Sequence, residues 1–520
     1  MTTATNPILP GFHPDPSICR VGADYYLATS TFEWHPGVRL LHSRDLVHWR
    51  ALPGPLTRPS QIDLEGVMDS GGVWAPCLSY AHGLFWLVYT RVLHTGGAFK
   101  DTPNYVVTAP SAEGPWSEPV FLNASGFDPS FFHDEDGRTW LVNMRWDHRP
   151  GRNRFNGIML QEYSRSSARL IGEAVRISSG STLGCTEGPH LLRRDGWYWL
   201  ILAEGGTGPN HAVNIARSRS LTGPYVFDPA GPMLTSRDAW ESPLQKAGHA
   251  SFVDTPAGDS YLVHLVARPD RPLGRCMLGR ETALQRVAWP GGAWPRLAHG
   301  GNRPALQVEV GLPAHPWPVI PETTDFRASV LPEDFCSLRR PIQPAWCRTG
   351  DGLTLVGGSG PTARFGQVRI ARRLQHHACR AETCVEFAAA DFQAFAGLSA
   401  FYDCDLWMMI ALTHDETLGA AVLLSWCDAG RYGSEAPVAV PAGRAVRLRF
   451  VIAQGVIRFA YALGEGGWTP LGEGRDAGQL SDENCGGGSN FTGTWASLSC
   501  HDLSGRAAIA RFTSFTYVGG

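Results

Sequence analysis

The sequence lacks any run of about 18 consecutive apolar residues, so it predicts no membrane-spanning helix. It also lacks an excess of charge of one sign, because 45 lysines and arginines are balanced by 48 aspartates and glutamates for a net charge of −3. Without a basic field, neither nucleic acid nor an anionic membrane is expected as a partner. The first ten residues hold neither the basic nor the apolar segment of a secretory signal. We therefore expect a cytoplasmic protein.

Cysteine is scarce, with 12 residues in 520. There is no Cys-x-x-Cys pair and no cysteine and histidine spacing of the kind that binds zinc. This excludes a disulfide scaffold and a structural zinc site, and it favours free, buried thiols in a reducing compartment. Hydrophobic residues still make up 43% of the chain, which is enough to build cores and excludes global disorder.

Turn-forming and aromatic residues are abundant. The chain has 59 glycines and 38 prolines, and 10% of its residues are aromatic. Many turns together with many aromatic residues favour an all-β protein over a helical one. At roughly 100–200 residues per domain, the length predicts two or more domains.

One sequence pattern recurs five times before residue 300. Each copy starts with a short segment that usually holds a proline, continues as a strand, turns at a glycine and ends in an aromatic strand. The copies are spaced by 53 to 61 residues and begin at Asp15, Ala75, Asp128, Gly188 and His249. A period of this size, with room for about four strands per unit, is typical of β-propeller blades. The sequence therefore predicts a five-bladed propeller over residues 1–302, the alternative being a β-sandwich with accidental periodicity.

The pattern stops after the fifth copy. Residues 303–332 contain six prolines, which remove ladder donors, so this segment is predicted to be a linker or a strap along the surface. From residue 333 to residue 520, short alternating segments are separated by glycine-rich turns. This pattern predicts a β-sandwich of the jelly-roll type.

The predicted propeller brings five chain positions together. The starts of the inner strands converge at one rim, and here they carry Asp15, the pair Trp74-Ala75, Asp128, the pair Glu187-Gly188 and His249. Taken singly, an aspartate before proline is often only a turn former, and a histidine is often a core residue. Three carboxylates at equivalent positions would repel one another, however, unless they serve a function.

Paired carboxylates beside flat aromatic rings are suited to cleaving a glycosidic bond. One carboxyl protonates the leaving oxygen and the other activates water or attacks the anomeric carbon, while a third adjusts the pKa of the proton donor. Sugars present C–H faces to aromatic rings, which makes Phe32, Trp74 and Trp146 candidate wall residues. The alternative for these three rings is ordinary blade core.

At these residues the chain resembles the family 43 glycoside hydrolases, and specifically the β-xylosidase branch with an appended sandwich domain. The resemblance covers the whole first domain and part of the second. The matching strings include Gly126-Phe127-Asp128-Pro129-Ser130 and Thr186-Glu187-Gly188-Pro189-His190, and it is the ordered set of strings that is specific. Further matching segments are 6–17, 70–76, 146–149, 203–207, 244–249, 278–282, 334–335 and 490–493.

The resemblance implies single-displacement hydrolysis with inversion of the anomeric configuration. It assigns Asp15 as the general base, Glu187 as the general acid and Asp128 as the carboxylate that raises the pKa of the acid. It also implies that a loop of the sandwich closes the pocket, with Phe491 as the candidate for the inserted residue and Trp495 as the second choice. The substrate contacts that it implies are Phe32, Trp74, Trp146, Thr207, His249, Arg280 and Phe491.

The implied activity is that of an exo-acting xylan 1,4-β-xylosidase, which releases D-xylose from the non-reducing ends of β-1,4-xylooligosaccharides. An α-L-arabinofuranosidase, as main or side activity, is the alternative, and a non-catalytic carbohydrate-binding propeller is a distant one. A fructan-cleaving enzyme would carry Asn-Asp-Pro-Asn where this chain has His13-Pro14-Asp15-Pro16.

The resemblance also bears on assembly and cofactors. Homodimers or homotetramers are usual in this branch, so a homo-oligomer is expected. Arg511-Phe512-Thr513 stands where some relatives have an acidic segment that helps to bind calcium. We therefore expect no cofactor and no metal, and the sequence gives little support to a calcium site.

Overall fold

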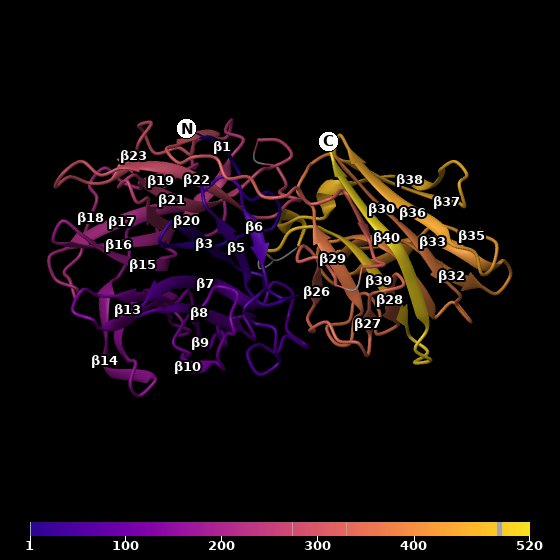
Figure 1. The fold of residues 1–520 in the computed structure, drawn as a ribbon, viewed down its shortest axis with the longest axis horizontal. Coiled ribbons are helices and arrows are strands. Elements are labelled where there is room, and N and C mark those ends of the chain that lie inside the picture. The colour runs from indigo at the N-terminus through magenta and orange to yellow at the C-terminus, as the bar shows by residue number, and fades with distance from the viewer. Residues whose placement is uncertain (1, 273, 329, 486–490) are drawn as a thin grey trace.

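The computed structural model describes residues 2–272, 274–328, 330–485 and 491–520 as two all-β bodies side by side. The N-terminal body is a five-bladed propeller and the C-terminal body is a two-sheet sandwich (Figure 1), which confirms the predicted fold class. Within the described residues, the only helices are the short 3₁₀ turns η1 (Ala477–Gln479) and η2 (Asp482–Asn484). No helix in this part of the chain is long and apolar enough to cross a membrane.

Each blade is an antiparallel sheet whose strands follow one another in chain order. Blade 1 contains β2 (Ser17–Val21), β3 (Asp24–Thr29), β5 (Arg39–Ser43) and β6 (Arg50–Leu52). Blade 2 contains β7 (Gly72–Ala81), β8 (Leu84–Val92), β9 (Asn104–Ala109) and β10 (Val120–Asn123). Blade 3 contains β11 (Ser130–His133), β12 (Thr139–Trp146), β13 (Phe155–Ser164) and β14 (Arg169–Ser178).

Blades 4 and 5 complete the ring. Blade 4 contains β15 (Glu187–Arg194), β16 (Trp197–Glu204), β17 (Ala212–Ser218) and β18 (Val226–Phe227), and β19 (Leu234–Thr235) also pairs with β17. Blade 5 contains β20 (Gln245–Asp254), β21 (Ser260–Ala267), β22 (Glu281–Ala288) and β23 (Arg296–Leu297). The first strands of the five blades, β2, β7, β11, β15 and β20, contact one another around the centre. The start of each sequence repeat therefore lies on the inner ring.

The propeller is closed by contacts between its first and last segments. Strand β1 (Thr2–Thr5) pairs with β24 (Gln307–Val310), which lies in the proline-rich segment after blade 5. The amide of Asn6 donates hydrogen bonds of 2.8 Å to the carbonyl oxygens of Leu284 and Ala305. These contacts hold blade 1 against blade 5.

The sandwich consists of two antiparallel sheets around one apolar core. In order across the first sheet lie β27 (Cys347–Arg348), β28 (Leu353–Val356), β40 (Ile509–Gly519), β30 (Cys379–Phe387), β36 (Val446–Ala453), β37 (Val456–Leu463) and β38 (Thr469–Asp476), with β25 (Thr323–Asp325) on β40. Across the second lie β34 (Arg431–Ser434), β33 (Gly419–Asp428), β32 (Leu406–Asp415), β31 (Ala394–Phe401), β39 (Trp495–Asp502), β29 (Arg369–Arg373), β26 (Cys336–Leu338) and β4 (Trp34–His35), with β35 (Val438–Ala439) on β33.

The strand β4 joins the two bodies. It belongs in sequence to the propeller, but it pairs with β26 at the edge of the second sandwich sheet. The ring of Trp34 in β4 stacks on that of Trp495, with 4.1 Å between the ring centroids. Trp495 is fully buried in this junction, so the second choice for a residue inserted in the pocket is wrong. Its indole instead packs in the apolar core between the two domains.

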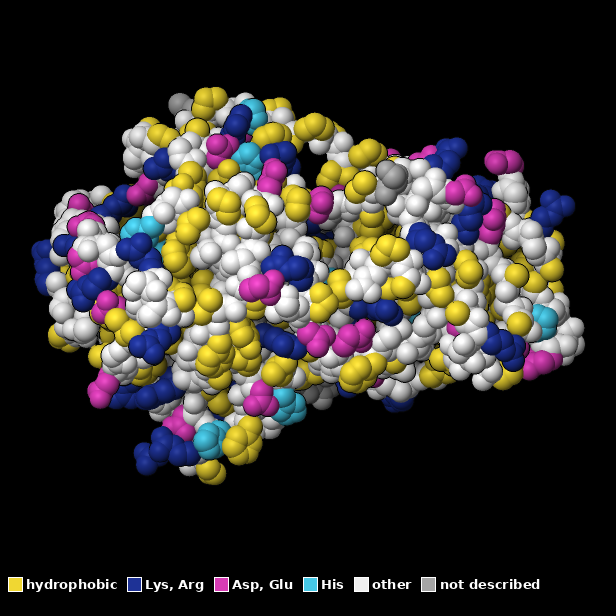
Figure 2. Space-filling model, turned by 60° about the horizontal axis from the view of Figure 1, so that its bottom comes forward, with side chains coloured by type: hydrophobic (Ala, Val, Ile, Leu, Met, Phe, Trp, Pro, Cys, Tyr) yellow, Lys and Arg dark blue, Asp and Glu magenta, His cyan; other side chains and the backbone are white. Residues whose placement is uncertain are grey.

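The described surface carries charges of both signs. Figure 2 shows acidic and basic side chains interspersed over the visible face, without a region of one sign. This distribution agrees with the near balance of charges in the composition.

Candidate active site

A cavity of about 250 Å³ opens at one rim of the propeller. All ten residues that the sequence analysis assigned to the site line it, although they come from all five blades and from the sandwich. They are Asp15, Phe32, Trp74, Asp128, Trp146, Glu187, Thr207, His249, Arg280 and Phe491. The other lining residues are Lys100, Phe127, Phe155 and Gly206.

The backbone at the start of each repeat is left-handed in all five blades. The φ angles are 54° at Asp15, 36° at Ala75, 55° at Asp128, 54° at Gly188 and 46° at His249. Residues other than glycine pay roughly 1–3 kcal/mol for such a conformation, and strain of this kind clusters at functional sites. The repeat therefore imposes one strained backbone geometry at the rim, and the residue at that position varies from blade to blade.

Blade 4 departs from this scheme by moving its carboxylate one residue upstream. A Cβ atom at Gly188 would lie 3.0 Å from Nδ1 of His249, so the left-handed position itself admits no side chain without displacement. Glu187 takes the preceding position, which in blade 2 is held by Trp74 and in blade 3 by Phe127. One acid of the pocket thus enters from a different backbone position than Asp15 and Asp128.

Asp15 is buried and held as an anion. Its Oδ1 lies 3.2 Å from Nη1 of Arg280 and 3.9 Å from Nδ1 of His249, and its Oδ2 accepts a hydrogen bond of 2.7 Å from the hydroxyl of Ser30. Burial alone would raise the pKa of this carboxyl, but Arg280, His249 and Ser30 together lower it below its ordinary value. Asp15 is therefore equipped to accept a proton from water.

Ser30 also fixes the neighbouring blade. Its Oγ accepts a hydrogen bond of 2.8 Å from the main-chain nitrogen of Ala75, at the left-handed position of blade 2. A single buried hydroxyl thus positions the carboxylate of blade 1 and the strained backbone of blade 2.

Asp128 and Glu187 have the opposite electrostatic character. Burial, followed by the charge of Asp15, raises the pKa of Asp128 to about 7, although Oδ2 accepts a hydrogen bond of 3.0 Å from the nitrogen of Gly188. Burial, followed by the charges of Asp128 and Asp15, raises the pKa of Glu187 well above its ordinary value, against the opposing effect of Arg280 and Lys100. Glu187 is therefore a proton donor at neutral pH.

A further buried carboxylate, that of Glu204, anchors the loop that leads to Glu187. The sequence analysis did not single out this residue. Glu204 is fully buried and its Oε1 accepts hydrogen bonds from the Thr186 hydroxyl at 2.7 Å and the Ser181 nitrogen at 2.8 Å. Its Oε2 accepts a bond of 2.8 Å from the Asn214 amide. These contacts fix the residue that immediately precedes the acid.

Aromatic rings form the apolar wall of the cavity. Phe127 lies with its ring centroid 5.6 Å from that of Trp74 and 6.1 Å from that of Trp146. Both indole nitrogens are used, because Trp74 donates to the carbonyl of Ser70 at 2.7 Å and Trp146 to that of Ala98 at 2.9 Å. The ring faces are thereby held in place for stacking against an apolar sugar face.

Phe491 brings the sandwich into the cavity. Its carbonyl oxygen accepts a hydrogen bond of 3.0 Å from Nη2 of Arg280, and its nitrogen donates one of 2.8 Å to the Ser70 hydroxyl. Its ring lies edge-on to Trp74 at 6.1 Å. The preceding residues 486–490, which include Asn490 of the matching segment, lie outside the described residues.

Lys100 is a lining residue that the sequence analysis missed. Its Nζ lies 4.7 Å from the ring centroid of Trp146, and burial lowers its pKa while the charge of Glu187 opposes that effect. The composition could have pointed to Lys100, because Lys100 and Lys246 are the only lysines in the sequence and arginine otherwise supplies the permanent positive charge. Phe127 was missed as well, although it precedes Asp128 as Trp74 precedes Ala75.

The described residues contain no group of three or more histidine, cysteine, aspartate or glutamate side chains that could hold a metal ion. None of the twelve cysteines, all of which lie within the described residues, forms a disulfide. The side chains that line the cavity supply carboxyls, a guanidinium, an amine, an imidazole, a hydroxyl and aromatic rings.

Two family models match nearly the whole chain. The model described as glycosyl hydrolases family 43 matches residues 4–295, and the model described as β-xylosidase C-terminal concanavalin A-like domain matches residues 323–518. The first match covers the propeller and the second covers the sandwich.

Individual relatives align end to end with this chain. A xylosidase/arabinosidase 43B of Humicola insolens is 45% identical over 99% of this chain and 98% of that protein. A xylan 1,3-β-xylosidase of a Vibrio species is 40% identical over 99% of both chains. The crystal structure of a xylan β-1,4-xylosidase from Bacillus halodurans C-125 superposes with a TM-score of 0.97, at 47% identity and 99% coverage of both chains.

Proposed function

The chain belongs to glycosyl hydrolases family 43, and from this premise we propose that it is an exo-acting, inverting β-xylosidase that releases D-xylose from the non-reducing ends of β-1,4-xylooligosaccharides. The observation that carries the proposal is the electrostatic contrast within one cavity between Asp15, whose pKa is lowered, and Glu187, whose pKa is raised. A glycosidase of this type needs one carboxylate and one carboxylic acid at the same pH.

The roles of the three acids follow from this contrast. Ionised Asp15 takes a proton from a water molecule as that water attacks the anomeric carbon, and protonated Glu187 donates its proton to the departing glycosidic oxygen. Burial keeps Glu187 protonated, and the negative charge of Asp128 adds to that effect. Arg280 balances the charge of Asp15 and keeps this carboxylate ionised until it takes the proton from the attacking water.

The shape of the cavity supports attack at a chain end. Phe491 closes one side of it through hydrogen bonds to Arg280 and Ser70, which come from the propeller. A cavity closed in this way accepts one terminal sugar residue more readily than the middle of a polysaccharide chain. The aromatic wall of Trp74, Phe127 and Trp146 provides a stacking surface for that sugar.

The relatives support xylosides as substrates. The names of the Humicola, Vibrio and Bacillus proteins all include xylosidase, with a β-1,3 linkage for the Vibrio protein and a β-1,4 linkage for the Bacillus protein. The structurally similar Bacillus protein is the more identical of these two, at 47% against 40%, which favours the β-1,4 linkage.

A second candidate activity is the hydrolysis of α-L-arabinofuranosides. The name of the Humicola relative includes arabinosidase beside xylosidase, and that protein matches this chain from end to end. An activity panel on aryl β-xyloside, aryl α-L-arabinofuranoside, β-1,4-xylobiose, β-1,3-xylobiose and arabinan ranks these possibilities by kcat/KM. A non-catalytic binding protein would bind xylobiose and release no sugar.

The decisive experiment follows the products of xylobiose by proton NMR. Inversion predicts that α-xylose is the first anomer released from the β-linked end, before mutarotation. Asp15→Asn and Glu187→Gln should each lower kcat by about 10²–10⁴-fold. Glu173→Gln, an exposed carboxylate of β14, is the matched control and should keep wild-type turnover. Wild-type turnover by either pocket variant, or β-xylose as the first product, would contradict the proposal.

The expected assembly follows from the resemblance, and the expected location follows from the sequence. We expect a homodimer or homotetramer that acts in the cytoplasm on imported oligosaccharides. Light scattering of the purified protein tests the first expectation.

A further inference from the structure

A second cavity, of about 420 Å³, lies at the junction of the propeller with the sandwich. It is lined by residues 8–10 and the strands β5 and β6 of the propeller, by residues 317–320 of the proline-rich segment, and by Asp334 and β29 of the sandwich. The cavity shares no lining residue with the one that holds Asp15 and Glu187. It is therefore a separate site.

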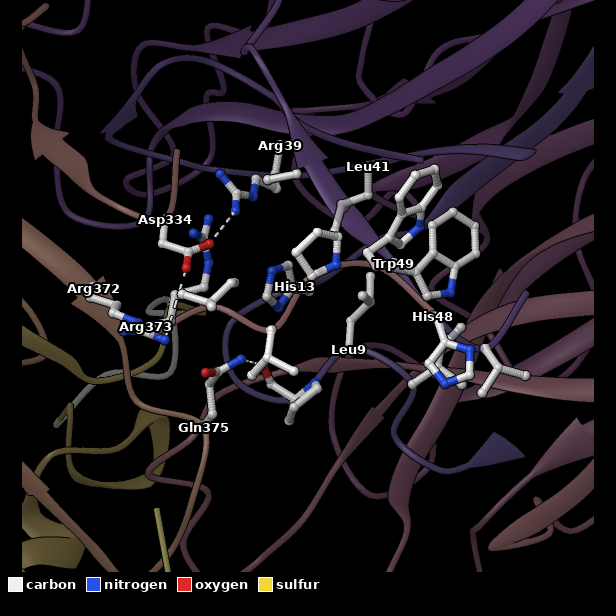
Figure 3. A pocket seen from close by; sticks show the side chains of 18 residues that line it. Leu9, His13, Arg39, Leu41, His48, Trp49, Asp334, Arg372, Arg373 and Gln375 are labelled. Atoms are coloured by element: carbon white, nitrogen blue, oxygen red, sulfur yellow. Dashed lines mark hydrogen bonds and ion pairs between the residues drawn. The ribbon is translucent and has the colours of Figure 1, made fainter. Parts of the chain in front are cut away.

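One end of this cavity carries an excess of positive charge. Arg39, Arg372 and Arg373 line it, and among the described lining residues Asp334 is the only acidic one. Figure 3 shows Asp334 between Arg39 and Arg372, at 3.0 Å and 3.8 Å from their guanidinium nitrogens. Burial, followed by the charges of Arg373 and Arg39, lowers the pKa of His13 well below its ordinary value, so His13 adds no charge. Among the lining residues, three guanidinium groups thus stand against one carboxylate, and Glu333 behind the wall acts electrostatically on Arg39.

The same cavity is lined by residues with unpartnered buried nitrogens. Among the described residues, Nδ1 of His13, Nε of Arg39, Nη2 of Arg373 and Nε1 of Trp317 are buried and have no hydrogen-bond partner. The last three nitrogens are donors in every relevant protonation state. Buried donors are normally satisfied, so three such donors in residues that line one cavity favour a ligand that brings acceptor oxygens.

The opposite wall is apolar. Leu9, Leu41 and Trp49 come from the propeller, and Trp317 and Pro318 come from the proline-rich segment. The indole of Trp317 is itself held by a tilted contact with the ring of His42 at 5.1 Å and by a cation–π contact with the guanidinium of Arg50 at 4.6 Å. Such a wall suits the apolar body of a ligand whose charged end reaches the arginines.

We propose that this junction cavity is a binding site for a small organic carboxylate with an apolar or aromatic body. The guanidinium groups of Arg372 and Arg373 bind the carboxylate, because planar guanidinium groups match carboxylate oxygens and are weakly hydrated. The rings of Trp49 and Trp317 contact the body of the ligand. An inorganic oxyanion would use only the charged end of a cavity of this size.

Isothermal titration calorimetry on the full-length wild-type protein tests the proposal with benzoate, its neutral isostere benzamide and inorganic phosphate. Benzoate should bind with a stoichiometry of one per chain, and benzamide at least about 10-fold more weakly, because it offers no charge to the guanidinium groups. Saturating xylose should leave benzoate binding unchanged, since the two cavities are separate. Equal binding of benzoate and benzamide, tighter binding of phosphate than of benzoate, or displacement of benzoate by xylose would overturn it.

Two variants locate the site. Arg372→Leu should weaken benzoate binding by about 10-fold or more, whereas the matched control Arg431→Leu, an exposed arginine of β34, should bind as the wild type does. If Arg372→Leu does not fold, Trp317→Ala replaces it, and loss of that ring should weaken benzoate and leave phosphate unaffected. Unchanged benzoate affinity in a folded Arg372→Leu or Trp317→Ala protein would also overturn the assignment.

Discussion

Nη2 of Arg280, in the propeller, donates a hydrogen bond of 3.0 Å to the main-chain carbonyl of Phe491, in the sandwich. Nη1 of the same guanidinium lies 3.2 Å from Asp15. The group that lowers the pKa of the proposed base therefore also holds the residue that closes the cavity. Charge stabilisation and closure depend on one side chain.

Removing the ring of Phe491 should weaken substrate binding. Phe491→Ala keeps the carbonyl that Arg280 binds but deletes the ring beside Trp74, so we expect KM for xylobiose to rise by about 10-fold, with a smaller change in kcat. Steady-state kinetics check this. Phe392→Ala removes an exposed ring elsewhere in the sandwich and serves as the control. An unchanged KM in Phe491→Ala would show that the ring does not contact the sugar.

The activity should depend on pH through two carboxyls with separated pKa values. Asp15 must be ionised, and because its pKa is lowered, activity should persist down to pH values below about 4. Glu187 must be protonated, so activity should fall as the pH rises through its raised pKa. The profile of kcat/KM against pH should therefore be bell-shaped with a broad plateau. A profile without an alkaline limb would contradict the role of Glu187 as the acid.

Asp128→Asn should move the alkaline limb to lower pH. The negative charge of Asp128 raises the pKa of Glu187, so its removal lets Glu187 ionise more easily. The amide keeps the shape of the side chain and can still accept the hydrogen bond from Gly188. The kcat/KM profile of the variant measures the shift. A limb at the wild-type position would show that Asp128 does not act on Glu187 through its charge.

Ser30→Ala should impair the base without removing it. The hydroxyl donates to Asp15 and lowers its pKa, so the variant should lose kcat and show an acidic limb at higher pH. Ser17→Ala is a close control, because the Ser17 hydroxyl accepts a hydrogen bond of 3.0 Å from Leu78 and joins the same two blades without touching Asp15. Both variants should lose about 1 kcal/mol of unfolding free energy, measured by denaturant titration. Equal pH profiles for the two would refute the role of Ser30.

Trp34→Ala should uncouple the two bodies. The buried indole stacks on Trp495 across the junction, and deleting a buried aromatic side chain typically costs about 3–5 kcal/mol. Calorimetry should show a lower transition temperature and separate unfolding transitions for the propeller and the sandwich. Trp468 directly precedes β38 in the first sheet of the sandwich, and Trp468→Ala tests whether the loss of any tryptophan separates the two transitions. A single transition at the wild-type temperature would contradict the coupling.

The propeller could be predicted from the sequence period because every blade repeats the same backbone conformation, including the left-handed residue at its rim. The three acids could be predicted for the same reason, because Asp15 and Asp128 occupy equivalent positions of the repeat and Glu187 stands one residue before that position. Lys100 and Glu204 could not be predicted, because Lys100 lies between β8 and β9 and Glu204 at the end of β16, away from the repeated rim position, and only their spatial neighbours reveal their roles. The pairing of β4 with β26 could not be predicted either, because a strand of two residues shows no hydrophobic periodicity.

The strand β4 has a consequence for how such proteins can be recombined. It is encoded within the propeller but completes the edge of a sandwich sheet, so no single cut in the gene separates two self-contained modules. A chimera joined within residues 303–332 would have to match a foreign edge to β26, and a mismatched edge exposes unpaired strand to aggregation. Chimeras of two relatives should fold when both domains come from the same relative, or when residues 34–35 are exchanged together with the sandwich. The two domains are therefore structurally interdependent at this edge.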